Sequence, residues 1–297
     1  MATSAAHQHT LARAAPIAGV GLHSGVAVHG AIRPAPANAG IRFVRSDLGG
    51  DNVIAARAEA VTQTRLGTVI ANAAGAEVST IEHLMSALAG LGVDNATVEL
   101  DGPEAPIFDG SSQAFVELID AAGLKRQSAS RHYIEIMQTV EIMDGDKRAS
   151  LSPAAGFEMA FEIDFKSAAI GTQLIDVELD EAAYRREIAP ARTFGFLHEV
   201  EALRKMGLAR GGTMENCLVI DGDVLINPEG LRFEDEFVRH KALDALGDLY
   251  LLGAPLIGRY ESVRGGHELN NALARALLGR PAAWRRRALA DDLAAVD

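Results

Sequence analysis

The sequence is poor in the residues that build disulfide scaffolds and membrane spans. Only one of its 297 residues is a cysteine, Cys217, so no disulfide can form within the chain and no thiolate cluster can bind a metal. No apolar run reaches the roughly 18 residues that cross a bilayer. The N-terminal stretch carries His7, His9, Arg13 and Pro16, where a signal peptide needs an unbroken apolar core. These absences indicate a cytoplasmic protein without an integral membrane segment.

Positive charge is also scarce, which bears on the partners. The chain has 28 Lys and Arg against 40 Asp and Glu, a net charge of −12. An acidic surface repels phosphate backbones, so we expect no nucleic-acid partner. A local basic pocket inside such a protein still suits a charged small substrate. Hydrophobic residues make up 48% and charged residues 23%, which is typical of a folded chain with a proper core.

The first half of the chain is predicted to mix strands and helices. Alternating apolar residues predict strands over 26–32 and 97–100, and apolar residues at helical spacing predict helices over 79–88 and 112–122. Glycines follow both helices, as expected at helix ends. The polar segment 125–131 (KRQSASR) has no apolar periodicity, so we interpret it as a linker.

The second half repeats this mixture after the linker. Strands and helices occur in both halves without regular alternation, which favours an α+β fold over a doubly wound α/β sheet. The predicted domains are 1–126 and 132–297. Strands are expected at 133–142, 149–151 and 157–165, and helices at 197–206, 234–252 and 270–278.

Glu82 and His83 are the first residues with catalytic chemistry, near the start of a predicted helix. They have a structural alternative. Ser79-x-x-Glu82 has the form of a capping box, in which Glu82 would satisfy a backbone N–H at the helix end. His83 would then be a core histidine with an ordinary hydrogen bond.

His240 and Asp244 are the second candidate pair. They are four residues apart, so they project from one face of a predicted helix. The rest of that face is apolar, so both groups need a partner or a ligand there. The structural alternative is a buried His–Asp hydrogen bond that needs no metal.

Together the two pairs supply His, His and Asp, the number of protein ligands that catalytic zinc sites use while leaving a position for water. Glu82 lies next to a ligand and could take a proton from that water. His267, after Gly265 and Gly266, could stabilise an oxyanion or protonate a leaving amine, held protonated by Asp248. Its alternative is an exposed histidine on a flexible loop.

Six blocks of the sequence resemble the UDP-3-O-acyl-N-acetylglucosamine deacetylases, and they occur in the same order as in that family. The likeness runs from about residue 10 to about residue 280, so it is far more specific than any single motif. The blocks are GVGLHSG (19–25), RPAPAN (33–38), STIEHL (79–84), ARTFGF (191–196), LRFEDEFVRHK (231–241) and GHELNN (266–271).

The resemblance implies one catalytic Zn²⁺ per chain bound by His83, His240 and Asp244, although Fe²⁺ also suits these ligands. It implies that Glu82 is the general base and that His267 is the general acid. It also implies a monomeric enzyme of two similar α+β domains with the active site between them. This enzyme would hydrolyse the N-acetyl group of UDP-3-O-(3-hydroxyacyl)-N-acetylglucosamine, the committed step of lipid A biosynthesis.

The resemblance also implies roles for residues around this centre. Asp248 would orient the general acid, and Thr193 would contact the oxyanion. The expected substrate-binding residues are the cations Lys241 and Lys147, Phe165 against the uracil, and Phe194 at the wall of an acyl-chain passage. Lys241 has an alternative as a solvated helix charge, and Phe165 as a core aromatic.

Two other functions compete with this one. The first is a zinc amidohydrolase that acts on a different N-acetyl sugar, and the second is a nucleotide-sugar sensor that has lost the chemistry. The complete set of acidic and imidazole side chains argues against the sensor, whereas only the substrate distinguishes the two enzymes.

Overall fold

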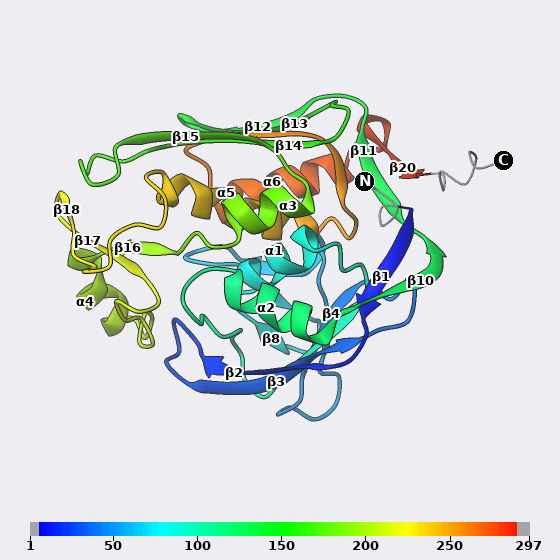
Figure 1. Ribbon diagram of the computed structural model, residues 1–297, viewed down its shortest axis with the longest axis horizontal. Coiled ribbons are helices and arrows are strands. Elements are labelled where there is room, and N and C mark those ends of the chain that lie inside the picture. The colour runs from blue at the N-terminus through cyan, green and yellow to red at the C-terminus, as the bar shows by residue number, and fades with distance from the viewer. Residues whose placement is uncertain (1–5, 290–297) are drawn as a thin grey trace.

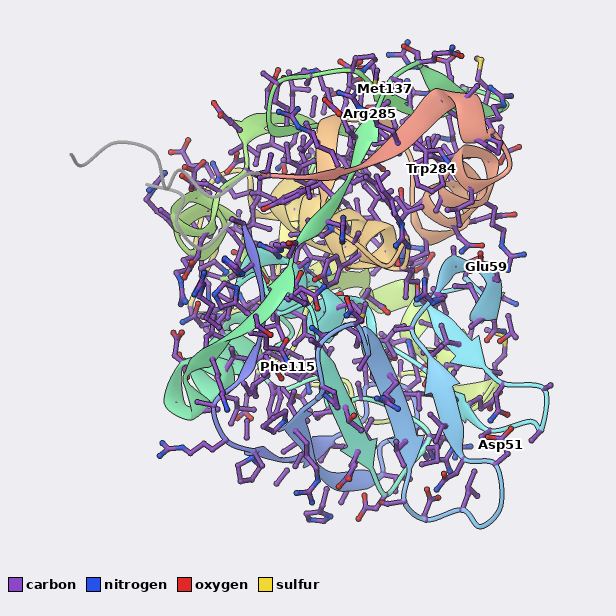
Figure 2. All side chains as sticks on the ribbon, turned by 90° about the vertical axis from the view of Figure 1, so that its right-hand side faces the viewer. Asp51, Glu59, Phe115, Met137, Trp284 and Arg285 are labelled. Carbon is purple, nitrogen blue, oxygen red and sulfur yellow. The ribbon has the colours of Figure 1, made fainter. Side chains whose placement is uncertain are left out.

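The computed structural model describes residues 6–289 and stacks two half-molecules, each with a sheet on its outer side and helices facing the other half (Figure 1). The predicted α+β class is confirmed. The halves meet through their helices, which lie between the sheets. Figure 2, viewed from the side, shows Phe115 in the lower half and Trp284 and Arg285 in the upper half, with the chain around residues 124–136 rising from one to the other.

The first half is built on a five-stranded sheet whose buried and half-buried side chains alternate. In β4 and β9 every second residue is buried, the pattern of strands with one face on a core. The order is β2-β3-β9-β4-β5, with a small hairpin sheet β6-β7-β8 beside it. The strands are β2 (Ala15–Val20), β3 (Ala27–Pro34), β4 (Ile41–Arg45), β5 (Val53–Ala55), β6 (Val61–Gln63), β7 (Val69–Ala71), β8 (Glu77–Val78) and β9 (Ala96–Leu100).

The second half is built on a larger mixed sheet in which β19 pairs with strands from several parts of the chain. It pairs antiparallel with β13 and parallel with β11 and β14, so it holds the sheet together. The strands are β11 (His132–Ile136), β12 (Val140–Asp144), β13 (Lys147–Ser152), β14 (Phe157–Asp164), β15 (Thr172–Glu178), β19 (Leu256–Val263) and β20 (Trp284–Ala288).

The helices form the inner layers, and α1 (Glu82–Gly90) packs directly against α5 (Glu236–Tyr250). Both are buried on nearly all sides, which fits α1 because its residues are mostly apolar or small. The buried acids and histidine of α5 need partners instead, because an unpaired buried charge is costly. Three further helices belong to the two halves, α2 (Gln113–Ala122), α3 (Glu181–Ala183) and α6 (His267–Leu278).

Gly247 allows the close approach of α1 and α5. A Cβ at this position would overlap the backbone carbonyl of Glu82, and backbone cannot move aside as a flexible side chain can. We expect Gly247→Ala to lower the free energy of unfolding by about 1–3 kcal/mol, the usual cost of overpacking a core. Urea unfolding measures this. Gly49→Ala, where an added Cβ meets nothing within 4 Å, is the control; an unchanged unfolding midpoint for Gly247→Ala would contradict the packing account.

A small unit extends from the second half at the left of Figure 1. It contains β16 (Phe194–Phe196), α4 (Leu197–Lys205), β17 (Leu218–Asp221) and β18 (Val224–Leu225). Helix α4 has no buried residue, although its sequence has an apolar face. Its apolar side chains are therefore left to line a cavity, described below.

The structure differs most clearly from the sequence predictions in three segments. Residues 125–130 of the predicted linker 125–131 belong to strand β10 (Leu124–Ser130), which pairs antiparallel with β1 (His7–Leu11). The predicted strand over 133–142 is two strands, β11 and β12. Helix α6 begins at His267, three residues before the predicted start at residue 270. Gly266, in an extended conformation, is its N-cap.

The division into domains 1–126 and 132–297 stays a prediction, and its outer ends, 1–5 and 290–297, lie outside the described residues. Between residues 6 and 289, no helix combines the length and apolar character that a membrane crossing requires.

Candidate active site

Helices α1 and α5 bring together the three predicted metal ligands. His83 comes from the first turn of α1, and His240 and Asp244 lie one turn apart on α5. All three side chains are buried, and one donor atom from each lies within 4.8 Å of the others. The rings of His83 and His240 stand edge to face, with centroids 4.9 Å apart. Close packing of the two helices therefore places donors from both halves around one point.

His240 presents an unprotonated nitrogen to this point. Its Nδ1 lies 3.0 Å from the carbonyl oxygen of Ala191, which can only accept, so Nδ1 carries the proton. Burial lowers the pKa of His240 to about 3, so the ring is neutral. The lone pair on its Nε2 then faces Oδ1 of Asp244 at 3.3 Å. No hydrogen bond joins these two atoms, because the single proton of the neutral ring is on Nδ1. Two electron-rich atoms at this distance need a cation between them, which argues against the simple His–Asp hydrogen bond.

Asp244 is held as a carboxylate with one oxygen free for a metal. Its Oδ2 accepts from Nζ of Lys241 at 2.9 Å, while Oδ1 also lies 3.5 Å from Nε2 of His83. Burial by itself would raise the pKa of Asp244, but the positive charge of Lys241 and the hydrogen bond from His83 lower it well below its usual value. One carboxylate oxygen and two imidazole nitrogens form the donor set of a catalytic zinc site, so the residues fit the ion.

Glu82 lies beside this cluster and does not cap its helix. Its Oε2 accepts from the backbone N–H of Thr68 at 3.0 Å, whereas the Ser79 hydroxyl donates to the carbonyl of Pro103. The capping-box alternative is therefore wrong. Burial raises the pKa of Glu82, although the nearby imidazoles of His267 and His83 oppose the shift. A carboxylate with a raised pKa is suited to take up a proton during a reaction.

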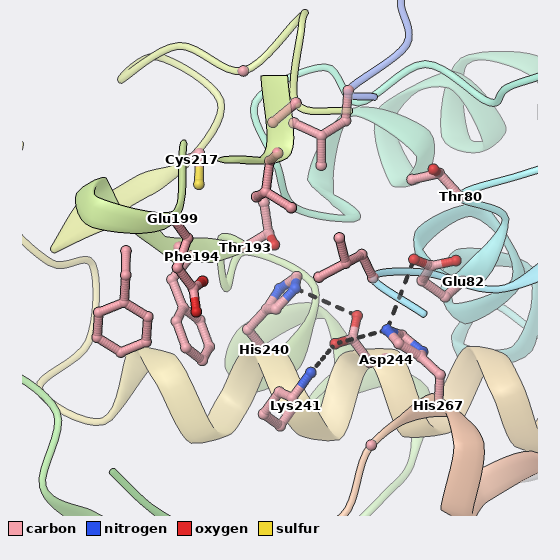
Figure 3. A pocket seen from close by; sticks show the side chains of 18 of the residues that line it. Thr80, Glu82, Thr193, Phe194, Glu199, Cys217, His240, Lys241, Asp244 and His267 are labelled. Carbon is pink, nitrogen blue, oxygen red and sulfur yellow. Dashed lines mark hydrogen bonds and ion pairs between the residues drawn. The ribbon is translucent and has the colours of Figure 1, made fainter. Parts of the chain in front are cut away.

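His267 faces Glu82 across the site, with its Nε2 4.0 Å from Oε1 of Glu82 and 3.9 Å from Oδ2 of Asp244. Its Nδ1 donates to Oδ2 of Asp248 at 2.8 Å. Burial would lower the pKa of His267, but Asp248, then Asp244 and Glu82, raise it to about 9. Its side chain is only 12% exposed, so the exposed-loop alternative is wrong. His267 is a cationic donor aimed into the site (Figure 3).

The cluster lies in a cavity of about 850 Å³ that continues toward the small unit around α4. Thr193, Phe194, Lys147 and Lys241 all line it, and Thr193 points toward His240 (Figure 3). Apolar side chains form the wall away from the cluster, among them Leu197, Val200, Leu203, Val219 and Ile226. The cavity thus combines a polar end with an apolar passage.

Asp248, which accepts a hydrogen bond from His267, and Phe165 are the two predicted site residues that are not among those lining this cavity. Phe165 is the one outside the hydrogen-bonded cluster. Its ring packs against Phe194 and Phe196, with centroids 5.6 Å and 5.9 Å apart. It is half-buried at the edge of the core. The structure thus places it behind the wall of the cavity, and its contact with a uracil stays a prediction.

Several residues that shape the site were not predicted from the sequence. Glu104 is buried and accepts hydrogen bonds from the backbone N–H groups of His23 and Ser24 and from the hydroxyl of Thr80. It thereby fixes two loops at the cavity. Thr68 and Asn270 contact Asp248. Asn270 stands within a block that carried the resemblance, but nothing in the residues around Glu104 or Thr68 signals such a role.

Comparison with known proteins decides the family. The sequence profile of the UDP-3-O-acyl N-acetylglycosamine deacetylases matches residues 8–279. This chain belongs to that family. Family members are metal-dependent, which agrees with the cluster of His83, His240 and Asp244.

Individual deacetylases of this family are similar over nearly their whole length. The UDP-3-O-acyl-N-acetylglucosamine deacetylase of Phenylobacterium zucineum is 65% identical over 288 residues, which cover 97% of this chain and 98% of the relative. The enzyme of the same name from Myxococcus xanthus is 49% identical, and the match covers 96% of this chain and 90% of the relative. The enzyme of the same name from Acidithiobacillus ferrooxidans is 52% identical, and the match covers 90% of this chain and 88% of the relative.

Proposed function

We propose that this chain hydrolyses the N-acetyl group of UDP-3-O-(3-hydroxyacyl)-N-acetylglucosamine, releasing acetate and the 2-amino sugar in the committed step of lipid A biosynthesis. One observation carries the proposal: two imidazoles and a carboxylate from both halves converge beside Glu82 at the polar end of an apolar cavity. The deacetylase names of relatives up to 65% identical support the same substrate.

Zn²⁺ is the proposed metal, held by His83, His240 and Asp244, and Fe²⁺ suits the same ligands. A bound Zn²⁺ polarises the acetyl carbonyl and lowers the pKa of a water molecule toward about 7. The chain orients its own donors for this purpose. Ala191 fixes the tautomer of His240, and Lys241 fixes the carboxylate of Asp244.

Glu82 and His267 are the proposed proton carriers. Glu82 takes a proton from the attacking water, because its buried carboxylate has a raised pKa and faces the cluster. His267 stabilises the negative charge that develops on the acetyl oxygen, together with Thr193, and then gives its Nε2 proton to the departing amine. Asp248 keeps His267 protonated and aimed into the site.

The rest of the cavity is proposed to bind the substrate. Lys147 and Lys241 supply positive charge to the substrate, and Phe165 contacts the uracil. Phe194 and the apolar side of α4 line the passage for the acyl chain, which explains why α4 leaves no residue buried. The monomeric state and the cytoplasmic location also stay predictions.

An acetate-release assay combined with metal analysis tests this function. We expect about one zinc per chain, turnover of the acylated UDP-sugar, loss of turnover after chelation and its recovery when zinc is returned. The same assay on UDP-N-acetylglucosamine without the acyl group should give a far lower rate. Comparable rates on both would favour the other amidohydrolase, and no acetate from the zinc-loaded protein would favour the sensor.

A further inference from the structure

Thr68 contacts both proton carriers of the proposed mechanism, although nothing in the sequence signals a role for it. It stands just before β7, in the first half of the chain. Its backbone N–H donates to Oε2 of Glu82 at 3.0 Å, and its hydroxyl donates to Oδ1 of Asp248 at 2.6 Å. Only 1% of the residue is exposed, so water does not compete for either hydrogen bond.

The hydroxyl of Thr68 completes the set of donors around Asp248. On the other carboxylate oxygen, Oδ2 accepts from Nδ1 of His267 at 2.8 Å and from the amide of Asn270 at 2.9 Å. Asn270 is held in turn by the hydroxyl of Tyr260 at 2.6 Å. A carboxylate with donors on both oxygens cannot rotate freely, so Oδ2 stays in line with His267.

One of the two hydrogen bonds of Thr68 also crosses between the halves of the molecule, because Thr68 lies in the first half with Glu82 and its hydroxyl reaches Asp248 in the second. Glu82 belongs to α1 in the first half, whereas Asp248 and His267 belong to α5 and α6 in the second. The hydroxyl oxygen of Thr68 lies 3.4 Å from Nδ1 of His267 as well. One residue therefore sets the position of the base relative to the acid, which face each other at 4.0 Å.

We infer that Thr68 is a positioning residue for catalysis, which holds Glu82 and the Asp248–His267 pair in a single frame. This inference rests on the proposed deacetylase function. The hydroxyl of Thr68 acts through Asp248, to which it donates. Its loss should slow the chemical step and leave substrate binding largely unchanged, because only the alignment of the acid changes.

Thr68→Val tests the inference, because valine has nearly the same shape, keeps the backbone N–H and lacks the hydroxyl. We expect kcat to fall roughly ten- to a hundredfold, the range for one hydrogen bond to a charged group, with KM changed by less than about threefold. Thr68→Ser, which restores the donor, should recover most of the lost kcat. Thr62→Val is the matched control, since Thr62 is exposed on neighbouring β6 and should keep wild-type kcat.

A double-mutant cycle with Asp248→Asn shows whether Thr68 acts through Asp248. If it does, Thr68→Val adds no further loss of kcat in the Asp248→Asn background. A crystal structure of Thr68→Val should show the Asp248 carboxylate turned and its bond to His267 lengthened. Wild-type kcat in Thr68→Val, or full additivity in the cycle, would overturn the inference.

Controls separate this inference from the proposed function and from misfolding. Each variant is compared with wild-type protein in the same assay, so a wild type that releases no acetate refutes the proposed function and not the role of Thr68. Metal content and the thermal unfolding midpoint show whether Thr68→Val is folded. If valine prevents folding, Thr68→Ala removes the same hydroxyl and is measured in its place.

Discussion

Replacing Asp244 with alanine is expected to abolish metal binding and to reduce kcat/KM by at least about a thousandfold. Asp244 is the only acid in the donor cluster, and its Oδ1 faces both His83 and His240. Without it, the site also loses the anion that balances Lys241. Metal analysis by mass spectrometry and acetate release measure the two effects on the same sample.

The control for this prediction is the removal of a carboxylate that does not line the cavity. Asp51 lies in an exposed turn of the first half (Figure 2), so Asp51→Ala should keep both the metal and the activity. Circular dichroism distinguishes loss of metal from loss of fold in Asp244→Ala. A folded Asp244→Ala protein with a full complement of metal and normal turnover would show that this carboxylate is not a ligand.

Replacing Glu82 with glutamine should separate catalysis from metal binding. The amide has the same shape and its oxygen can still accept from the backbone N–H of Thr68, but it cannot take up a proton. We expect kcat to fall roughly 10²- to 10⁴-fold, the usual contribution of a general base, with metal content near that of wild type. Single-turnover measurement of acetate release follows the chemical step directly.

Glu77→Gln supplies the matched control for this substitution. Glu77 is exposed on β8, a short distance before α1 in the chain, and we expect its amide variant to turn over at the wild-type rate. Near-normal kcat in Glu82→Gln would assign the role of base to another group. Loss of the metal in Glu82→Gln would instead show that the carboxylate takes part in binding it.

The elements that the sequence predicted correctly have strong local signals. Helix α2 carries apolar residues at helical spacing and ends at Gly123, whose φ of 71° suits glycine. Helix α5 was found within two residues at each end because its apolar pattern is long. Strand β10 was missed because it is a largely exposed, polar strand and so lacks alternation. Its pairing with β1 depends on contacts distant in the sequence.

Site residues could be predicted where reactive side chains are adjacent in the sequence or one helical turn apart. Spacing and chemistry made candidates of the i, i+4 pair His240 and Asp244 and of the adjacent Glu82 and His83, and the resemblance to the deacetylases joined the two pairs into one proposed site. Their convergence required the packing of α1 on α5, which no local pattern encodes. Thr68 and Glu104 were missed for the same reason, since each is an isolated polar residue whose partners come from distant segments.

Diffraction data collected on either side of the zinc absorption edge test the central claim most directly. The account predicts a single strong anomalous peak, about 2.0–2.2 Å from Nε2 of His83, Nε2 of His240 and a carboxylate oxygen of Asp244. A zinc-loaded crystal with no peak among these three side chains, or with its peak elsewhere in the molecule, would contradict it.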